Sequence, residues 1–256
     1  MNREEFEGRI YANWARHFGC RVGDMHRGGT ILLPSWRYAG SRGIHIWYIG
    51  GGSFVQMGPE YAEEVAHVLS SLPPGTSLSG DDLQTAWGRE VTNERSVGLV
   101  YYLYPSDLHP PALTRPFAMR RLTADDAVHL DDLFEASLAE EVSEAYVAVD
   151  HDIAFGCFAG DRLVAAGSGS QRAGFMDLGV LTQPGYRGLG LGRAAVAALC
   201  EWCLGRELIP QYRCDEEDKY SRSLAEGLGF RLYFRQESLW LMRGALLSAD
   251  AIADLV

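Results

Sequence analysis

Residues 183–192 combine residue types that can hold an anionic group. They read Gln-Pro-Gly-Tyr-Arg-Gly-Leu-Gly-Leu-Gly, so Gly188, Gly190 and Gly192 stand at alternate positions. Glycine permits positive φ and lets main-chain N–H groups approach an anion closely, and the N-terminus of a following helix adds its dipole. Arg187 and Arg193 flank the glycines with positive charge. The pattern therefore favours a pyrophosphate as the ligand of this loop.

Two other interpretations compete for the same glycines. The dinucleotide fingerprint G-x-G-x-x-G requires its third glycine one residue later than Gly192 and a parallel βαβ unit around the loop. A structural turn without a ligand is about as compatible with the glycines as a binding site is. The secondary structure on either side of the loop must therefore decide between a ligand-binding loop and a structural turn.

A strand leads into the loop and a helix leads out of it. Alternating apolar residues predict the strands, and apolar residues at helical spacing predict the helices. The elements expected in this part of the chain are strands at 117–121, 153–159, 162–170 and 175–182, helices at 125–137 and 140–148, the loop, a helix at 191–206, a strand at 209–214, a helix at 217–228 and strands at 230–236 and 238–242. Gly160 and Asp161 predict a tight hairpin. The succession indicates an α/β (α+β) fold with a mixed sheet.

A proline-rich segment at 104–116 predicts a domain boundary. Its four prolines remove backbone donors and disfavour helix in the residues before them. We expect an N-terminal α/β domain at 1–110 and a C-terminal domain at 111–256. The elements expected in the first domain are helices at 4–18 and 59–72 and strands at 30–33, 44–49, 53–57 and 99–104. The glycines at 50–52 lack the Lys, Ser or Thr of a P-loop and predict a hairpin turn.

The charge balance argues against nucleic acid as a partner. The chain has 23 Lys+Arg against 34 Asp+Glu, a formal net charge of -11, which repels a phosphate backbone. It has no apolar run of about 18 residues or more, and it begins with a charged amphipathic stretch rather than a signal peptide. We therefore expect no membrane partner and a cytoplasmic location.

The cysteines, histidines and clustered acids do not predict a metal site. Cys200 and Cys203 form a C-x-x-C, but they lie in the apolar helical run AAVAALCEWCLG without a second ligand pair nearby. Packing in the core explains them better. The histidines are scattered without metal-ligand spacing, so we assign no metal. The acids at 215–218 are interpreted as stabilisers of a helix N-terminus.

Taken with its neighbours, the loop resembles motif A of the GNAT superfamily of N-acetyltransferases. The family writes this loop (Q/R)-x-x-G-x-(G/A), and here it appears as Arg187-Gly-Leu-Gly-Leu-Gly192. The matching segments are LGVLTQPGYRGLGLGR at 178–193, IPQYR at 209–213 and SRSLAEGLGF at 221–230. The resemblance covers 117–242 and implies a C-terminal GNAT fold. By analogy alone, one interpretation of the N-terminal domain is a vestigial GNAT-like copy.

The resemblance also assigns roles to individual residues. It implies acetyl-CoA as the cosubstrate, with its pantetheine arm and thioester carbonyl on the backbone of Val180, Leu181 and Thr182. The residues implied to hold the pyrophosphate are Arg187, Gly188, Leu189, Gly190, Leu191 and Gly192, with Arg193 beside them. Ser221 lies on a helix face that could reach the cofactor.

Two positions depart from the family pattern. Many members carry a tyrosine five residues before Phe230 that protonates the departing thiolate, and this chain has Ala225 there. An Asn that the family often places twelve residues before the same Phe is replaced by Asp218. Tyr220 lies on a different helix face from residue 225, whereas Ser221 shares that face. No catalytic residue is assigned.

The expected function is transfer of an acetyl or other acyl group to an amine of a small-molecule acceptor, by direct attack of the amine on the thioester. CoA can leave without a dedicated acid because a thiol has a pKa of about 8.5. The alanine at 225 leaves a second interpretation open, a catalytically weak or inactive CoA-binding sensor or scaffold. A third is a non-enzymatic partner subunit. Edge strands at 231–242 are expected to allow a homodimer.

Overall fold

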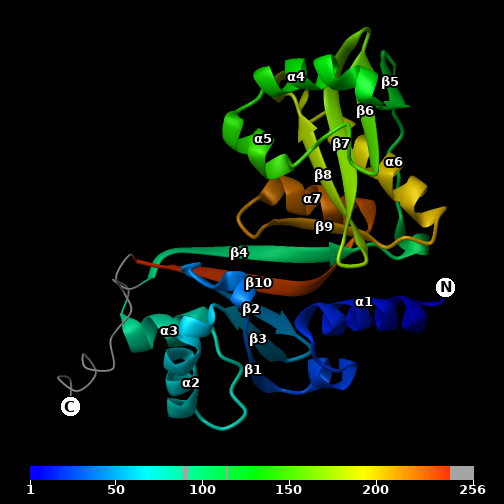
Figure 1. Cartoon of the computed structure of the whole chain (residues 1–256). Coiled ribbons are helices and arrows are strands. Elements are labelled where there is room, and N and C mark those ends of the chain that lie inside the picture. The colour runs from blue at the N-terminus through cyan, green and yellow to red at the C-terminus, as the bar shows by residue number, and fades with distance from the viewer. Residues whose placement is uncertain (89–91, 114, 243–256) are drawn as a thin grey trace. The chain divides into compact units, whose positions relative to one another are not determined.

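The computed structural model describes residues 1–88, 92–113 and 115–242, and the chain forms two compact units (Figure 1). Unit 1 comprises Met1–Phe6, Val100–Cys214 and Asp218–Leu232, and unit 2 comprises Glu7–Leu99, Asp215–Glu217 and the chain from Tyr233 onward. Each unit thus combines segments that are distant in sequence. The domains expected at 1–110 and 111–256 stay a prediction, because compactness does not show which segments fold on their own.

Unit 1 contains a mixed set of strands. They are the end of β4 (Thr92–Tyr102), β5 (Phe117–Arg121), β6 (Ile153–Ala159), β7 (Arg162–Arg172), β8 (Phe175–Thr182) and β9 (Pro210–Asp215). Their order is β4-β9-β8-β7-β6-β5. β5 to β8 pair antiparallel, whereas β8 and β9 run parallel. The predicted α/β class with a mixed sheet is confirmed, and so is the hairpin between β6 and β7.

Helices cover both faces of these strands. They are α4 (Ala127–Glu135), α5 (Ala139–Ala145), α6 (Leu191–Leu204) and α7 (Lys219–Leu228). Successive residues of β8 point to opposite faces. Leu181 is buried in one core with Leu130 of α4, whereas Gly192 of α6 lies against Val180 and Thr182. Figure 1 shows α5 and α6 on opposite sides of β7 and β8. The strand that leads into the glycine loop is therefore held from both sides.

Unit 2 has its own strands and helices. They are most of α1 (Arg3–Phe18), β1 (Gly29–Pro34), β2 (Gly43–Ile49), β3 (Gly52–Met57), α2 (Ala62–Ser71), α3 (Gly80–Trp87), the start of β4, and most of β10 (Arg231–Leu241). The strand order is β1-β3-β2-β10-β4. Gly50 and Gly51, with φ of 59° and 87°, turn β2 back onto β3, which confirms the predicted hairpin. Val65 of α2 and Leu83 of α3 pack on Ile44 of β2 in one apolar core.

The C-terminal strand differs from the prediction. The sequence predicts strands at 230–236 and 238–242 at a sheet edge, but β10 is one strand and lies between β2 and β4. Its polar run Arg-Gln-Glu-Ser at 235–238 resembles a turn in sequence, yet pairing with β2 continues from Arg235↔Tyr48 to Trp240↔Gly43. β10 is therefore not available as an edge strand for the pairing expected in a homodimer.

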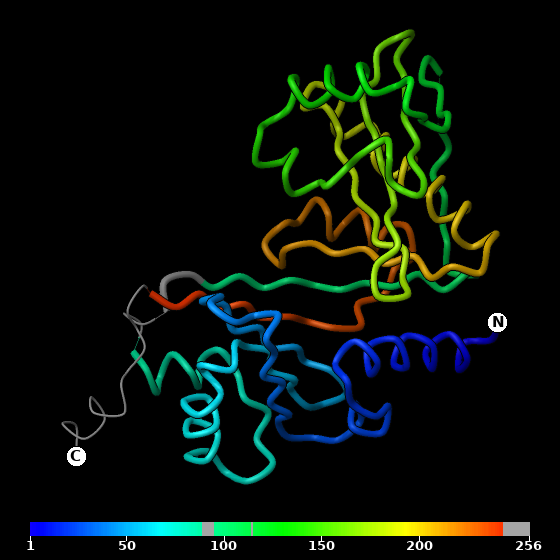
Figure 2. The backbone as a smooth tube through the Cα atoms, in the orientation of Figure 1, coloured from blue at the N-terminus to red at the C-terminus, as the bar shows by residue number. Residues whose placement is uncertain are grey.

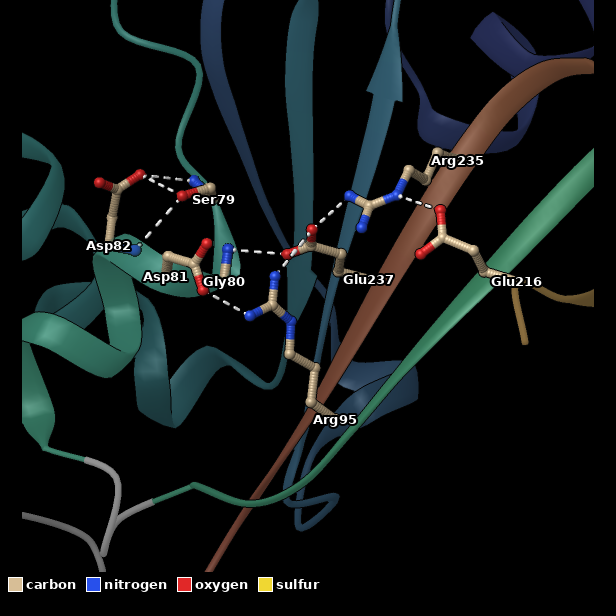
Figure 3. Close-up of polar contacts among 8 residues, drawn as sticks. All are labelled: Ser79, Gly80, Asp81, Asp82, Arg95, Glu216, Arg235 and Glu237. Atoms are coloured by element: carbon tan, nitrogen blue, oxygen red, sulfur yellow. Dashed lines mark hydrogen bonds and ion pairs between the residues drawn. The ribbon is translucent and has the colours of Figure 1, made fainter.

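Buried polar contacts explain why β10 continues through this run. The Glu237 carboxylate, whose side chain is 3% exposed, accepts the Gly80 N–H at 2.8 Å and pairs with Arg95 at 3.1 Å. Arg235 pairs with the same carboxylate, and Figure 3 shows all three donors directed at it. Burial alone would raise the pKa of Glu237, but the Gly80 N–H and the two guanidinium groups outweigh burial and hold this pKa below its ordinary value.

Helix α3 is absent from the sequence prediction. It begins with glycine, a poor helix former, and has few apolar residues. A capping box fixes its start, because Ser79 Oγ accepts the Asp82 N–H at 3.3 Å and the Asp82 carboxylate accepts the Ser79 N–H at 2.8 Å. None of the helices among the described residues is long and apolar enough to cross a membrane.

Candidate functional site

The glycine loop connects β8 to α6, a path that can be followed in Figure 2. After Thr182, a short 3-10 turn covers Pro184–Tyr186. Gly188 and Gly190 have φ of 77° and 76°, in the left-handed region that favours glycine. A Cβ on Gly192 would stand 2.7 Å from Thr182 Oγ1. All three glycines therefore meet a structural requirement, and together they bring the start of α6 against the end of β8.

Helix α6 begins without a side-chain cap. Its N-cap residue is Gly190, and no cap hydrogen bond from a side chain is present there in the described chain. The first main-chain N–H groups of a helix have no acceptor within the helix, so those of α6 can bind an anion. In α7, by contrast, Asp218 Oδ1 accepts the N–H groups of Tyr220 and Ser221, each at 3.0 Å. The N-terminus of α6 stays open, whereas a carboxylate closes that of α7.

Arg187 fastens the loop to its neighbours. Its guanidinium pairs with Glu141 of α5 at 2.7 Å, and its Nε donates to the Thr182 carbonyl at 3.3 Å. The side chain keeps 47% of its surface exposed. Part of the positive charge expected beside the loop is therefore neutralised by Glu141. Leu189, at the tip of the loop, is 57% exposed, whereas Leu191 is buried.

Strands β8 and β9 form a fork directly before this loop. Among the residues that the structure describes, they pair only at Met176↔Pro210, Asp177↔Gln211 and Leu178↔Tyr212. Beyond Leu178, the other edge of β8 stays paired with β7 as far as Ala165↔Thr182. Residues 179–182 thus have one paired edge and one free edge. This free edge contains Val180, Leu181 and Thr182, and because the Leu181 side chain is buried on the other face, only its backbone can serve a ligand.

Two further observations fit a bound pantetheine and pyrophosphate. Gln183 Oε1 is buried without a hydrogen-bond partner among the described residues. It immediately follows the free edge of β8, so a ligand N–H could satisfy it. A side chain at Gly192 would fill the space between α6 and Thr182. The sequence gives no signal for Gln183, since nothing in its type or spacing distinguishes it from a loop glutamine.

Tyr212 stands at the last paired position of the fork, near the side chain of Ser221 on α7. Burial raises the pKa of Tyr212 to about 12. A proton transfer from such a phenol to a thiolate, whose acid has a pKa of about 8.5, is uphill by about 5 kcal/mol. The Tyr212 and Ser221 pair can therefore donate hydrogen bonds but is a poor acid. Ala225, on the same face of α7, is fully buried.

A second polar cluster lies on the α5 face of the fork. Asp177 of β8 accepts from Arg213 Nε at 2.9 Å and from Gln211 Nε2 at 3.2 Å. Gln211 Oε1 in turn accepts the hydroxyl of Tyr102 at 2.7 Å. An acceptor that approaches this face would meet polar groups, but Arg213 also binds the second oxygen of Asp177. Sequence spacing does not reveal this cluster because three strands contribute to it.

The remaining sequence predictions concern acids and thiols. Asp218 caps α7, and Asp215 accepts the Glu217 N–H at 2.8 Å, as expected of acids at a helix N-terminus. Cys200 and Cys203 are buried within α6, which confirms their place in the core. Burial raises the pKa of both thiols, that of Cys203 to about 12. Thiols of this kind are poor nucleophiles near neutral pH.

Comparisons with known proteins point to the same segment. Residues 138–236 match a family model described as GNAT acetyltransferase. A GCN5-related N-acetyltransferase from Sphaerobacter thermophilus is similar in structure, with a TM-score of 0.53 and 12% identity over 73% of this chain and 71% of that one. An acetyltransferase of the GNAT family from Colwellia psychrerythraea gives a TM-score of 0.51 and 14% identity over 73% of this chain and 76% of that one. At these identities the similarity concerns the fold. A comparison with curated proteins found no match.

Proposed function

We propose that this chain, whose residues 138–236 match a family model described as GNAT acetyltransferase, transfers an acetyl group from acetyl-CoA to an amine of a small molecule. The observation that carries the proposal is the free edge of β8 beyond Leu178, followed by a glycine loop that ends at the uncapped start of α6. A free strand edge can hydrogen-bond an extended amide chain, and an open helix N-terminus can bind a pyrophosphate. CoA carries these two groups next to each other.

Particular residues would hold acetyl-CoA. The main-chain N–H groups of residues 188–192 would bind the pyrophosphate, with Arg193 adding positive charge. The backbone of residues 180–182 would hold the pantetheine, and Gln183 Oε1 would accept one of its amide N–H groups. The thioester supplies an activated acyl group, which the amine attacks directly.

Hydrogen bonds would support both ends of the bond that breaks. N–H groups on the free edge of β8 would donate to the carbonyl oxygen as it gains negative charge, and such preorganised donors stabilise a transition state more than water does. Tyr212 and Ser221 would donate toward the departing sulfur. A dedicated acid is not required, because a thiol with a pKa of about 8.5 leaves tolerably as thiolate near neutral pH. Orientation would carry more of the rate.

The buried Ala225 favours a second candidate function. A protein that binds CoA without transferring its acyl group, as a sensor or scaffold, needs the loop and the fork but no proton donor. Both candidates predict CoA binding. They differ in whether any amine is acetylated.

Titration calorimetry with acetyl-CoA and CoA tests the shared premise. Wild type should bind with a Kd near 1 μM, about −8 kcal/mol, and Gly190→Arg should abolish binding because the new side chain fills the loop. Gly160→Arg is the matched control, since Gly160 also has a positive φ, 63°, and open space around it, but lies in the β6–β7 turn. It should bind CoA as wild type does.

A panel of small amines then separates the two candidates, with release of free CoA as the readout. Transfer to any amine by wild type but not by Gly190→Arg supports the acetyltransferase. Binding without transfer to any amine in a broad panel supports the sensor. If wild type does not bind CoA, the loop is structural and both candidates fail. Cytoplasmic location and a homodimer stay predictions that these experiments do not address.

A further inference from the structure

Arg213 stands at the opening of the fork between β8 and β9. The last residues that the two strands pair in the described chain are Leu178 and Tyr212. Gly179 and Arg213 follow them, so they are the first residues on the two sides of the opening. Gly179 also begins the free edge along which acetyl-CoA is proposed to bind. A group held by Arg213 would therefore lie beside the proposed thioester.

Asp177 holds the guanidinium of Arg213 in one orientation. Arg213 Nε donates to one carboxylate oxygen of Asp177 at 2.9 Å, and Nη2 donates to the other. The Asp177 side chain is only 9% exposed, and it also accepts from Gln211 Nε2 at 3.2 Å. A buried carboxylate that is hydrogen-bonded by two side chains has little freedom to move. Because two parallel hydrogen bonds to one carboxylate fix the plane of a guanidinium, that of Arg213 is preorganised at the fork.

The pair with Asp177 leaves one edge of this guanidinium free. Nη1 has no hydrogen-bond partner among the described residues, and the Arg213 side chain is 46% exposed. Arg120 shows the opposite case, because its Nη1 and Nη2 both bind Asp126, at 2.9 and 2.6 Å. The Nη1–Nη2 edge of a guanidinium can bind a carboxylate with two parallel hydrogen bonds. Arg213 therefore presents this edge to a second carboxylate.

Ser170 is a second sign that this face of the fork lacks a ligand. It stands directly opposite Asp177 on β7, and the side chains of directly opposed residues lie on the same face of a sheet. Its Oγ is buried and has no hydrogen-bond partner within the described part of the chain. Buried hydroxyl groups normally have such a partner. A polar acceptor bound on this face would supply one.

We propose that the acceptor is an amino acid whose carboxylate binds the free edge of Arg213, an inference that rests on the proposed function. The amino group stands one carbon away from this carboxylate, so it would reach the thioester on the free edge of β8. A simple amine is a cation and would face the positive guanidinium without a carboxylate to bind it. The formal net charge of -11 on the chain would by itself favour the cation. A preference for the amino acid would therefore have a local cause.

Matched pairs of acceptors that differ only in the carboxylate test this inference. Each pair is an amino acid and the amine left when its carboxylate is removed, such as alanine and ethylamine, leucine and isopentylamine, or phenylalanine and phenethylamine. Release of free CoA is the readout. Wild type should show a kcat/KM at least about tenfold higher for the amino acid, as expected of hydrogen bonds to a charged group.

Arg213→Gln should bring this ratio close to one, mainly by raising the KM of the amino acid. Arg213→Lys keeps the charge but not the planar set of donors, so it should retain part of the ratio. The glutamine variant also leaves the buried Asp177 without its cation. Titration calorimetry with CoA therefore accompanies each variant, because binding at the glycine loop shows that unit 1 is folded.

Arg231→Gln is the matched control. Arg231 is 60% exposed and pairs with Asp107 through Nε at 2.9 Å, a similar pair in unit 1 that lies outside the fork. It should keep the wild-type ratio. Equal kcat/KM for both members of each pair in wild type, or an unchanged ratio in Arg213→Gln, would overturn this inference and leave the proposed function intact. Without CoA binding, or without transfer to any amine, both fail.

Discussion

Tyr212 of β9 and Ser221 of α7 lie near each other at the fork. Tyr212→Phe removes the phenol hydroxyl with little change in shape. If the pair stabilises the departing thiolate, the thiol of bound CoA should have a pKa below about 8.5 in wild type, and the variant should raise it by about one unit. The ultraviolet absorbance of the thiolate of bound CoA, followed across pH, measures this without any acceptor.

Tyr102→Phe is the control for this titration. Tyr102 is also buried, and its hydroxyl hydrogen-bonds a residue of β9, Gln211, in the cluster of Asp177 on the other face of the fork. The bound thiol should titrate there as in wild type. An equal pKa in wild type and Tyr212→Phe would show that the hydroxyl does not act on the sulfur.

Individual residues of the site differ in how far sequence reveals them. Gly188, Gly190 and Gly192 are recognisable because their spacing has a backbone cause, and the structure supplies that cause at each of them. Gln183 and Tyr212 are not recognisable. The proposed role of each depends on a neighbour that is distant in sequence and is brought close by folding. Neither the residue type nor the local spacing predicts that neighbour.

The buried carboxylate of β10 makes a prediction at the scale of the element. Glu237→Gln leaves Arg95 and Arg235 without their shared anion in a largely buried setting. We expect a loss of about 2–4 kcal/mol in unfolding free energy, less than for a fully buried pair because both arginines retain contact with water. Urea unfolding followed by tryptophan fluorescence measures this loss.

Glu216→Gln is the matched control, because Glu216 contacts the same Arg235 at 3.4 Å but is 43% exposed. Its unfolding free energy should lie within about 0.5 kcal/mol of wild type. Equal stability of Glu237→Gln and Glu216→Gln would contradict the role given to the buried contacts.

Elements with strong periodicity are predicted well, and the failures have a common cause. The strands and helix around the glycine loop follow apolar patterns that burial imposes on both faces. Helix α3 and the unbroken β10 are held by polar contacts at Ser79, Asp82 and Glu237 instead. A polar residue in the sequence is normally predicted to be exposed to solvent. Sequence patterns therefore do not predict a polar side chain that is buried against a polar partner.

Acidic pH should destabilise both units. Burial alone would raise the pKa of Asp107 and of Glu237. Arginine partners outweigh burial at Asp107, the Gly80 N–H and two arginines outweigh it at Glu237, and hydrogen bonds from Arg120 lower the pKa of Asp126. A carboxyl whose pKa is lowered in the folded state contributes stability above its unfolded pKa and loses it as pH falls. The midpoint of urea unfolding should therefore fall steeply below about pH 4. A smaller fall should begin below about pH 6.5, because burial lowers the pKa of His17 and of His45 in the folded state. Asp126→Asn should flatten part of the fall, and a midpoint independent of pH would contradict the assignment.

The whole molecule is the scale at which sequence is least informative. The proline-rich segment predicts a single domain boundary at 104–116, yet β4 and β10 each contribute residues to both units. Unit 2 contains most of β10 because β10 pairs with β2. The paired residues Arg235 and Tyr48 are about 190 positions apart in the chain. No local pattern encodes a partner at that distance. Whether unit 2 is a vestigial copy of the fold stays a prediction.

That pairing also affects how the chain is made. On the ribosome, β2 emerges early, whereas its β10 partner follows only after about 190 further residues. At about 5–20 residues per second, the nascent chain keeps this edge of β2 unpaired for about 10–40 s. An open strand edge can pair with a neighbouring chain. Translation that stops before residue 231 should therefore yield an aggregation-prone product, whereas chains completed through β10 close this edge themselves.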